Sequence, residues 1–258
     1  MRVWLLLLVA GCTPSPVVLT PPVPPDQHVP DYARRPFEPF SRTNAIAIAL
    51  REWRAFGSMV DDGPPRAEAP GGGRTDNQPG LWQRVGDYWW FGLDAGSPDV
   101  ALTPRYDASG APYAGAAPAW SAAFISYVMR TAGAGTGFPY SPLHADYINA
   151  AARGAGVLQA GAPDRMAAVP GDIICLPRGE AAGLRYADLP APPFTAHCDL
   201  VVGATPSVLT VVGGNVGASV TMKHVPVADG LLAPGGRVLD DRYNWFAVLR
   251  VRYEAMLP

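Results

Sequence analysis

Three polar residues of the kinds used in nucleophilic catalysis stand in the chain in the order Ser121, His197 and Asn215. The surrounding patterns predict that they lie at a helix start, a strand start and a strand end, respectively. Ser121 falls in the first turn of its helix, where free backbone N–H groups and the positive end of the helix dipole point outward. This position suits a nucleophile, but it also suits a capping serine, which is the commoner role on this segment alone.

The elements that must position these residues change type along the chain. Apolar residues at helical spacing predict helices over residues 41–56, 81–93, 119–131 and 143–153. Apolar runs of strand type follow over residues 171–176, 197–203, 207–212, 218–225 and 245–253. Helices followed by consecutive strands predict an α+β fold, with N-terminal helices packed on a mostly antiparallel sheet of five to six strands.

The chain contains four short motifs in a fixed order: Trp120-Ser121-Ala122-Ala123-Phe124, Pro170-Gly171-Asp172, the strand from Ala196 to Val202, and Val212-Gly213-Gly214-Asn215. They resemble the nucleophile helix, the first strand, the histidine strand and the Gly-Gly-Asn segment of CHAP-type peptidoglycan amidases. Over a longer stretch, roughly Ala45 to Val251, the chain resembles an uncharacterised bacterial family, domain of unknown function 2272. The resemblance implies a papain-like (CHAP/NlpC-like) core and hydrolysis of an amide bond in peptidoglycan.

The resemblance also implies residue roles, with Ser121 as nucleophile, His197 as general base and Asn215 as the residue that orients the imidazole. These enzymes use cysteine where this chain has Ser121. A serine hydroxyl does not ionise as a thiol does, so its proton must move to His197 during attack. Support of the resulting imidazolium then matters more. Asp199, on the same strand face as His197, is a second candidate for that role, with a solvated or structural carboxylate as the equally weighted alternative.

Four further residues are candidates for the wall of a substrate groove: Tyr88, Trp89, Trp120 and His144. Aromatic residues this dense more often fill a core, and His144 is more typical of a packed or capping histidine than of a catalytic one. The long segment from Pro177 to Ala196 enters directly at His197, and it is predicted to form one wall of the groove.

Cys175 and Cys198 lie on two strands that are predicted to be antiparallel neighbours. A register that pairs Asp172 with Val201 puts the two cysteines opposite each other, which predicts a disulfide in an oxidising compartment. Buried free thiols are the alternative.

The N-terminus predicts export and lipid attachment. A charged start and an apolar run too short to cross a bilayer are typical of a signal peptide, here residues 1–11. Val9-Ala10-Gly11-Cys12 resembles a bacterial lipobox, which implies cleavage before Cys12 and a lipid on its sulfur; an ordinary signal peptide with an incidental cysteine is the alternative. Residues 12–40 form a Pro-rich tether, and residues 41–258 are predicted to form a single domain. Thr13, where an Asp would signal retention, resembles the pattern of lipoproteins on the periplasmic face of the outer membrane.

These features predict a lipid-anchored cell-wall amidase or endopeptidase that uses no cofactor or metal. An inactive relative that binds peptidoglycan or a partner protein is one alternative. A serine esterase or acyltransferase is another, because an activated serine is better suited to esters than to amides. The net charge of -2 and a pI of about 6.1, without a basic stripe, do not indicate a nucleic-acid partner. The expected partners are peptidoglycan or its peptides, and the membrane through Cys12.

Replacing Cys12 by Ala is expected to release the protein from the membrane fraction, because the lipid then has no sulfur to attach to. Cell fractionation and immunoblotting measure this, with Thr13→Ala as a neighbouring control that stays in the membrane. A Cys12→Ala protein that remains bound and is processed like the parent would contradict the lipid anchor.

Overall fold

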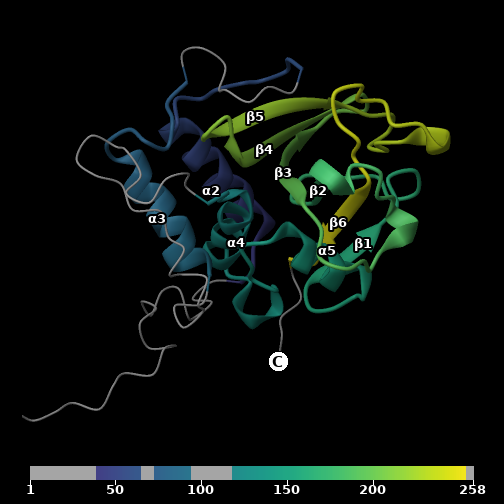
Figure 1. The fold of residues 1–258 in the computed structure, drawn as a ribbon, viewed down its shortest axis with the longest axis horizontal. Helices are drawn as coiled ribbons and strands as arrows, with labels where there is room; N and C mark the ends of the chain where they lie inside the picture. Colours follow the sequence, from purple (N-terminus) through teal and green to yellow (C-terminus); the bar gives the residue numbers. More distant parts are fainter. Residues whose placement is uncertain (1–38, 65–72, 94–117, 254–258) are drawn as a thin grey trace, which may run out of the picture.

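The computed structural model describes residues 39–64, 73–93 and 118–253; the predicted signal peptide, Cys12 and most of the tether lie outside these residues. Within them the fold is α+β, which confirms the predicted class (Figure 1). The helices all precede the strands and are α2 (Arg42–Ala55), α3 (Leu81–Gly92), α4 (Ser121–Thr131) and α5 (His144–Ala152). None of these described helices is long and apolar enough to cross a membrane.

The strands form one six-stranded sheet in which every neighbouring pair is antiparallel. They are β1 (Leu158–Gly161), β2 (Ile173–Pro177), β3 (Ala196–Ala204), β4 (Val208–Val216), β5 (Ser219–Pro226) and β6 (Ala247–Val251), in the order β1-β6-β2-β3-β4-β5. Strand β1 is not among the predicted strands, because its four residues are too few for a clear pattern. β4 runs through the Gly-Gly-Asn segment, so Asn215 lies inside the strand rather than after it.

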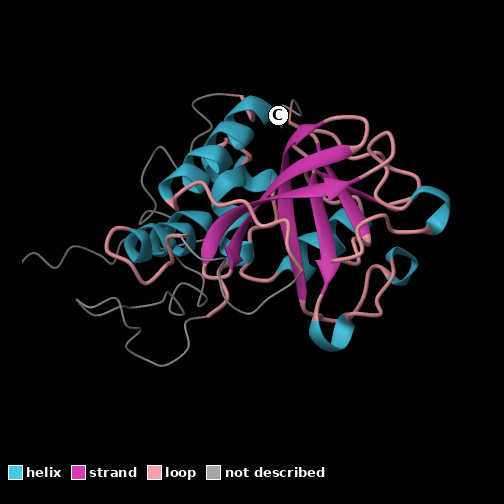
Figure 2. Ribbon diagram, turned by 90° about the horizontal axis from the view of Figure 1, so that it is seen from above, coloured by secondary structure: helices cyan, strands magenta, loops and turns pink. Residues whose placement is uncertain are grey.

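Helix α4 is the centre of the helical layer. Every residue from Ser121 to Met129 is buried, because the sheet lies on one side of the helix and α2 and α3 lie on others. Figure 2 shows the longer helices gathered on one side of the twisted sheet. The helix that carries Ser121 is therefore packed on all sides.

The two faces of the sheet pack against different cores. One face carries Cys175, Cys198 and Leu200 toward the helices, and the other carries Ile174, Leu176 and Val201 toward a second, smaller cluster that includes Trp245. Since side chains alternate along a strand, His197 and Asp199 lie on the face opposite Cys198.

Cys175 and Cys198 form a disulfide in the structure and are not free thiols. Ile173 pairs with Leu200, which is the predicted register, and Cys175 therefore stands opposite Cys198. The two are joined by a disulfide that cross-links β2 and β3 one residue from His197.

Two glycines on α3 differ sharply in their surroundings. A methyl group at Gly92 would stand 2.7 Å from the carbonyl oxygen of Ala123 and 2.7 Å from the amide nitrogen of Tyr127, both backbone atoms of α4. Gly86, on the same helix, has nothing within 4 Å of that position. The close crossing of α3 over α4 therefore depends on Gly92.

Gly92→Ala is expected to lower the free energy of unfolding by about 1–3 kcal/mol, because backbone atoms of α4 cannot move aside as a side chain can. Gly86→Ala is the matched control, and it should raise the free energy of unfolding by about 0.5–1 kcal/mol, since alanine favours a helix interior. Urea denaturation of both variants measures the difference. Equal effects of the two substitutions would show that the crossing is looser than described.

Candidate active site

Ser121 is the first residue of α4, and its hydroxyl binds a histidine. Trp120 occupies the N-cap position without a side-chain capping bond, so Ser121 is not the capping residue. Ser121 Oγ lies 2.7 Å from Nε2 of His144, the first residue of α5. The other ring nitrogen of His144, Nδ1, bonds the hydroxyl of Tyr147, one turn further along the same helix. Ser121, His144 and Tyr147 thus form a buried chain of hydrogen bonds.

The protons of this chain can be assigned from what each group must satisfy. Burial raises the pKa of Tyr147 well above its ordinary value, so its hydroxyl keeps its proton. That proton needs an acceptor, and among the described residues His144 Nδ1 is the one that bonds it. His144 then carries its own proton on Nε2 and donates it to Ser121 Oγ. The hydroxyl proton of Ser121 is left to bond elsewhere.

A second polar group lies at the start of β3. His197 Nε2 is 2.8 Å from Asp199 Oδ1, and the Nζ of Lys223 on β5 donates to Asp199 Oδ2 at 2.5 Å. All three side chains are buried. An ionised carboxylate only accepts, so His197 Nε2 carries the proton that it donates to Asp199. His197 Nδ1 is therefore an acceptor, and it is buried without a partner among the described residues.

The charges of the second group follow from its contacts. Burial alone would raise the pKa of Asp199, but the charges of Lys223 and His197 and their hydrogen bonds hold it well below its ordinary value, so the carboxylate is ionised. Burial lowers the pKa of His197, against the opposing charge of Asp199. Burial also lowers the pKa of His144 well below its ordinary value, and nearby positive charge adds to this. Both histidines are neutral at pH 7.

The two groups meet through their histidines. The rings of His144 and His197 are 5.5 Å apart, centroid to centroid, and stand edge to face. The exposed fractions of Ser121, His144 and His197 are 8%, 5% and 3%, so the site has only a narrow opening to solvent. Within the described residues, the predicted hydrogen bond between Ser121 and His197 is absent, because His144 holds the Ser121 hydroxyl instead.

The Gly-Gly-Asn segment of β4 fits closely against the Asp199 and His197 side chains and against helix α4. A methyl group at Gly213 would overlap the Asp199 carboxylate and stand 3.0 Å from His197 Nε2. A methyl group at Gly214 would stand 2.6 Å from Phe124 of α4. Asn215 adopts a left-handed backbone (φ 56) at an irregular point of the β4–β5 pairing, which asparagine tolerates better than most residues. It makes no bond to His197, so the contact expected of Asn215 is made by Asp199.

The aromatic candidates for a groove wall are core residues. Tyr88 donates its hydroxyl to the buried carboxylate of Glu52 at 2.7 Å, and Trp120 Nε1 donates to Asp76 at 2.8 Å. Tyr88, Trp89 and Trp120 are 0–1% exposed, so they do not line a groove. Of the four groove candidates, only His144 has its side chain bonded to Ser121 Oγ.

Sequence reasoning missed Lys223, Tyr147 and the contact of His144 with Ser121. A weak signal existed for each. Lys223 stands at strand spacing between Thr221 and Val225, so it shares a strand face with two residue types that suit a buried sheet face, and a lysine buried there needs a partner. His144 and Tyr147 stand three residues apart and so share a helix face. No cluster of His, Cys, Asp and Glu in the described ranges can hold a metal ion.

Comparison with known proteins identifies a family to which the sequence is similar. Residues 76–251, about two thirds of the chain, match the model of a family described as an uncharacterized protein conserved in bacteria, domain of unknown function 2272. No curated protein and no solved structure matches the chain.

The two neutral histidines predict a loss of stability in mild acid. Their pKa values in the folded protein lie below the ordinary value of about 6.5, so the unfolded chain takes up protons first as the pH falls. The stability that they contribute is complete above that pH and is lost as the pH falls toward their folded pKa values. Each histidine contributes at most about 1.4 kcal/mol per pH unit.

His144→Gln is therefore expected to flatten the dependence of the unfolding free energy on pH between about pH 6.5 and 5. Glutamine keeps a donor and an acceptor near Ser121 and Tyr147 but does not titrate. Urea denaturation at a series of pH values measures the slope. An unchanged slope in the variant would contradict a neutral, buried His144.

Proposed function

We propose that this chain, which belongs to the bacterial family known as domain of unknown function 2272, is a serine hydrolase that cleaves an amide bond of peptidoglycan. Ser121 is the nucleophile, His197 is the general base, and Asp199 orients the imidazole. His144 positions Ser121 Oγ by donating a hydrogen bond to it. The proposal extends to location, with the enzyme exported and held at the membrane through a lipid on Cys12.

The observation that carries the proposal is the unpartnered Nδ1 of His197. This nitrogen is a buried acceptor on a neutral ring whose other nitrogen is bonded to an ionised carboxylate. The adjoining histidine holds a serine whose hydroxyl proton is unassigned. His197 thus has a free lone pair that can accept a proton, and Ser121 has a hydroxyl proton to give, with His144 between them. These are the two components of a serine nucleophile once they come within hydrogen-bond reach.

The reaction follows from these groups. When the substrate enters, the Ser121 hydroxyl turns from His144 toward His197, and Oγ attacks the carbonyl carbon of the amide while its proton passes to His197 Nδ1. Free N–H groups in the first turn of α4 stabilise the oxyanion. The tetrahedral intermediate expels the amine, which takes the proton from His197 and leaves an acyl group on Ser121. Water then attacks the acyl group with His197 again as base, which releases the acid and restores the serine.

Asp199 favours proton transfer to His197, and Lys223 weakens this effect by partly neutralising the Asp199 carboxylate. When His197 accepts a proton, the ionised Asp199 stabilises the imidazolium. Lys223 partly neutralises that carboxylate and keeps it ionised despite its burial. The pair therefore favours a histidine that is neutral at rest and accepts a proton only during attack.

The choice of peptidoglycan rests on the resemblance of the motifs around Ser121, His197 and Gly213 to CHAP-type amidases. A nucleophile at the start of a helix, packed against an antiparallel sheet that carries the histidine, is the papain-like arrangement that the resemblance implies.

A relative that binds cell-wall peptide without cleaving it is the second candidate. The observation in its favour is that the Ser121 hydroxyl is bonded to His144 and not to His197, at a site with little exposure. Activity of the wild-type protein separates the two candidates.

Digestion of purified sacculi by the wild-type protein, with products identified by mass spectrometry, tests the proposal. Ser121→Ala and His197→Gln should each lower the rate by about 10⁴-fold or more, because the two residues act as a unit. Ser126→Ala is the matched control on the same helix. Ser126 bonds the Ser141 carbonyl rather than the site, so this variant should keep the activity.

Ser121→Cys completes the design. If only this variant digests sacculi, the scaffold is competent and the natural protein is a binder. If the wild type cleaves a nitrophenyl ester but leaves sacculi intact, the chain is a serine esterase. If neither protein cleaves either substrate, the hydrolase proposal fails.

A further inference from the structure

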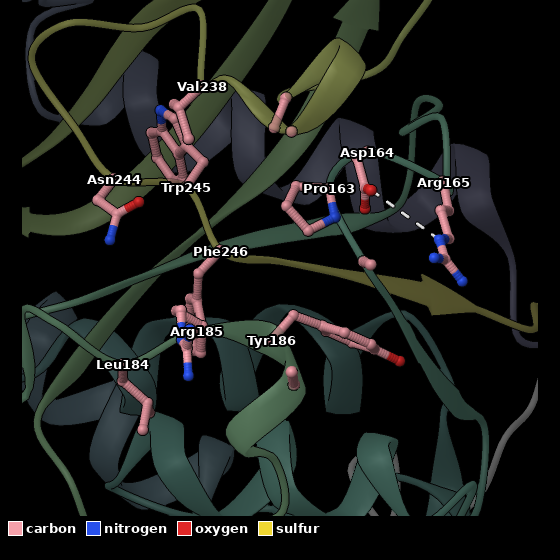
Figure 3. A pocket seen from close by; sticks show the side chains of 14 residues that line it. Pro163, Asp164, Arg165, Leu184, Arg185, Tyr186, Val238, Asn244, Trp245 and Phe246 are labelled. Atoms are coloured by element: carbon pink, nitrogen blue, oxygen red, sulfur yellow. Dashed lines mark ion pairs between the residues drawn. The ribbon is translucent and has the colours of Figure 1, made fainter.

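A cavity of about 670 Å³ lies at the end of the sheet where β6 begins, and its lining residues are separate from those of the candidate active site. Its volume lies within the range of about 300–1,000 Å³ that is usual for small-ligand sites. Its walls come from the segment after β1, the turn of helix at Tyr186–Asp188, the loop before β6 and the first residues leading into β6. Figure 3 shows Leu184, Arg185 and Tyr186 on one side and Pro163, Asp164 and Arg165 on another.

The cavity and the active site lie at the same end of the sheet. In the antiparallel order, β1 and β2 end where β6 and β3 begin, as the pairs Gly161 with Val248 and Pro177 with Ala196 show. The cavity is built at the ends of β1 and β6, and His197 stands near the start of β3. Only β2 lies between β6 and β3 in the sheet, so the backbones of β6 and β3 are two strand spacings, or about 10 Å, apart.

One continuous segment connects them. Residues 178–195 leave β2 and return to β3, and they are tied at their base by the bond from Arg178 N–H to the carbonyl of Thr195 (2.9 Å). Asn149 of α5 holds the middle of the segment through two bonds to the backbone of Ala191. Phe194, three residues before His197, packs edge to face on Phe246, which lines the cavity.

The lining combines partly exposed apolar side chains with two arginines at the rim. Leu184, Tyr186 and Val238 are partly exposed, and Trp245 and Phe246 form a buried floor beneath them. The side chains of Arg165 and Arg185 are 85% and 80% exposed; Arg165 pairs with Asp164 at 3.9 Å, and Arg185 makes two bonds of 3.4 Å to Asp188. The two aspartates balance the charge of the arginines, but exposed pairs of this length contribute little, so a ligand carboxylate can take the place of either aspartate. Guanidinium groups bind carboxylates well because their geometries match.

We propose that this cavity binds the part of the substrate next to the scissile bond, and that this part is a short peptide with an apolar side chain and a free carboxylate. The apolar side chain packs on Leu184, Tyr186 and Val238, and the carboxylate binds Arg165 and Arg185. The inference rests on the proposed function for its link to cleavage, but peptide binding is measurable without any reaction.

The test titrates two probes into the full chain by calorimetry: N-acetyl-Gly-Leu with a free carboxylate, and the same dipeptide as its amide. The wild type should bind the acid about three- to tenfold more tightly than the amide. The double variant Arg165→Gln/Arg185→Gln should lose this preference. Arg54→Gln, an exposed arginine on α2 that does not line the cavity, is the matched control and should keep it.

A cavity-filling variant keeps the test independent of charge. Ala187 is an exposed lining residue, so Ala187→Trp should block both probes without disturbing the buried floor. Equal affinity for acid and amide, or no saturable binding of either probe up to about 10 mM, would overturn the inference.

The outcomes also separate this inference from the proposed function. Carboxylate-dependent binding by a protein that leaves sacculi and esters intact would support the cavity and refute the hydrolase. Digestion of sacculi at the same rate and KM by the wild type and the double arginine variant would support the hydrolase and refute the cavity as its subsite.

Discussion

The carboxylate of Asp199 is the constraint on which the rest of the site depends. A charge removed from water is tolerable only when it is paired and fully hydrogen-bonded, and here Lys223 and His197 each satisfy one oxygen. The Lys223 contact requires β5 to lie two strands away in a fixed register, and the carboxylate leaves room only for glycine at position 213. One buried charge thus fixes three strands and one ring orientation.

The helical layer meets this charged group by close backbone packing. Gly214 admits Phe124, and Gly92 admits the backbone of α4, so the helix that begins at Ser121 lies close to both the sheet and α3. The result is a serine held by one histidine while a second histidine, held by Asp199, keeps an open acceptor. The components of a nucleophilic site are present, with His144 between the serine and its proposed base.

Sequence patterns predict the helices, most strands and the register of β2 on β3, because apolar periodicity and the Cys175–Cys198 spacing reflect local geometry. They place Ser121, His197 and Asp199 on the correct elements. They do not predict that His144 binds Ser121, since that contact joins two helices through the tertiary packing of α5. Lys223 is missed for the same reason, as its partner stands 24 residues earlier. Tyr88 and Trp120 are misassigned to a groove because an aromatic residue in a core and one at a ligand look alike in sequence.

The segment of residues 178–195, which connects β2 to β3, can vary in sequence among relatives because of where it lies in the fold. It is fastened where it meets the strands and through Asn149, while its tip makes one wall of a cavity and takes no part in the sheet. Insertions, deletions and substitutions at such a tip are tolerated, because surface loops carry few of the contacts that stabilise a fold. Relatives can therefore keep the same arrangement around Ser121 and His197 while the sequence of this one loop changes, so that the lining of the cavity can vary without any change in the buried polar groups.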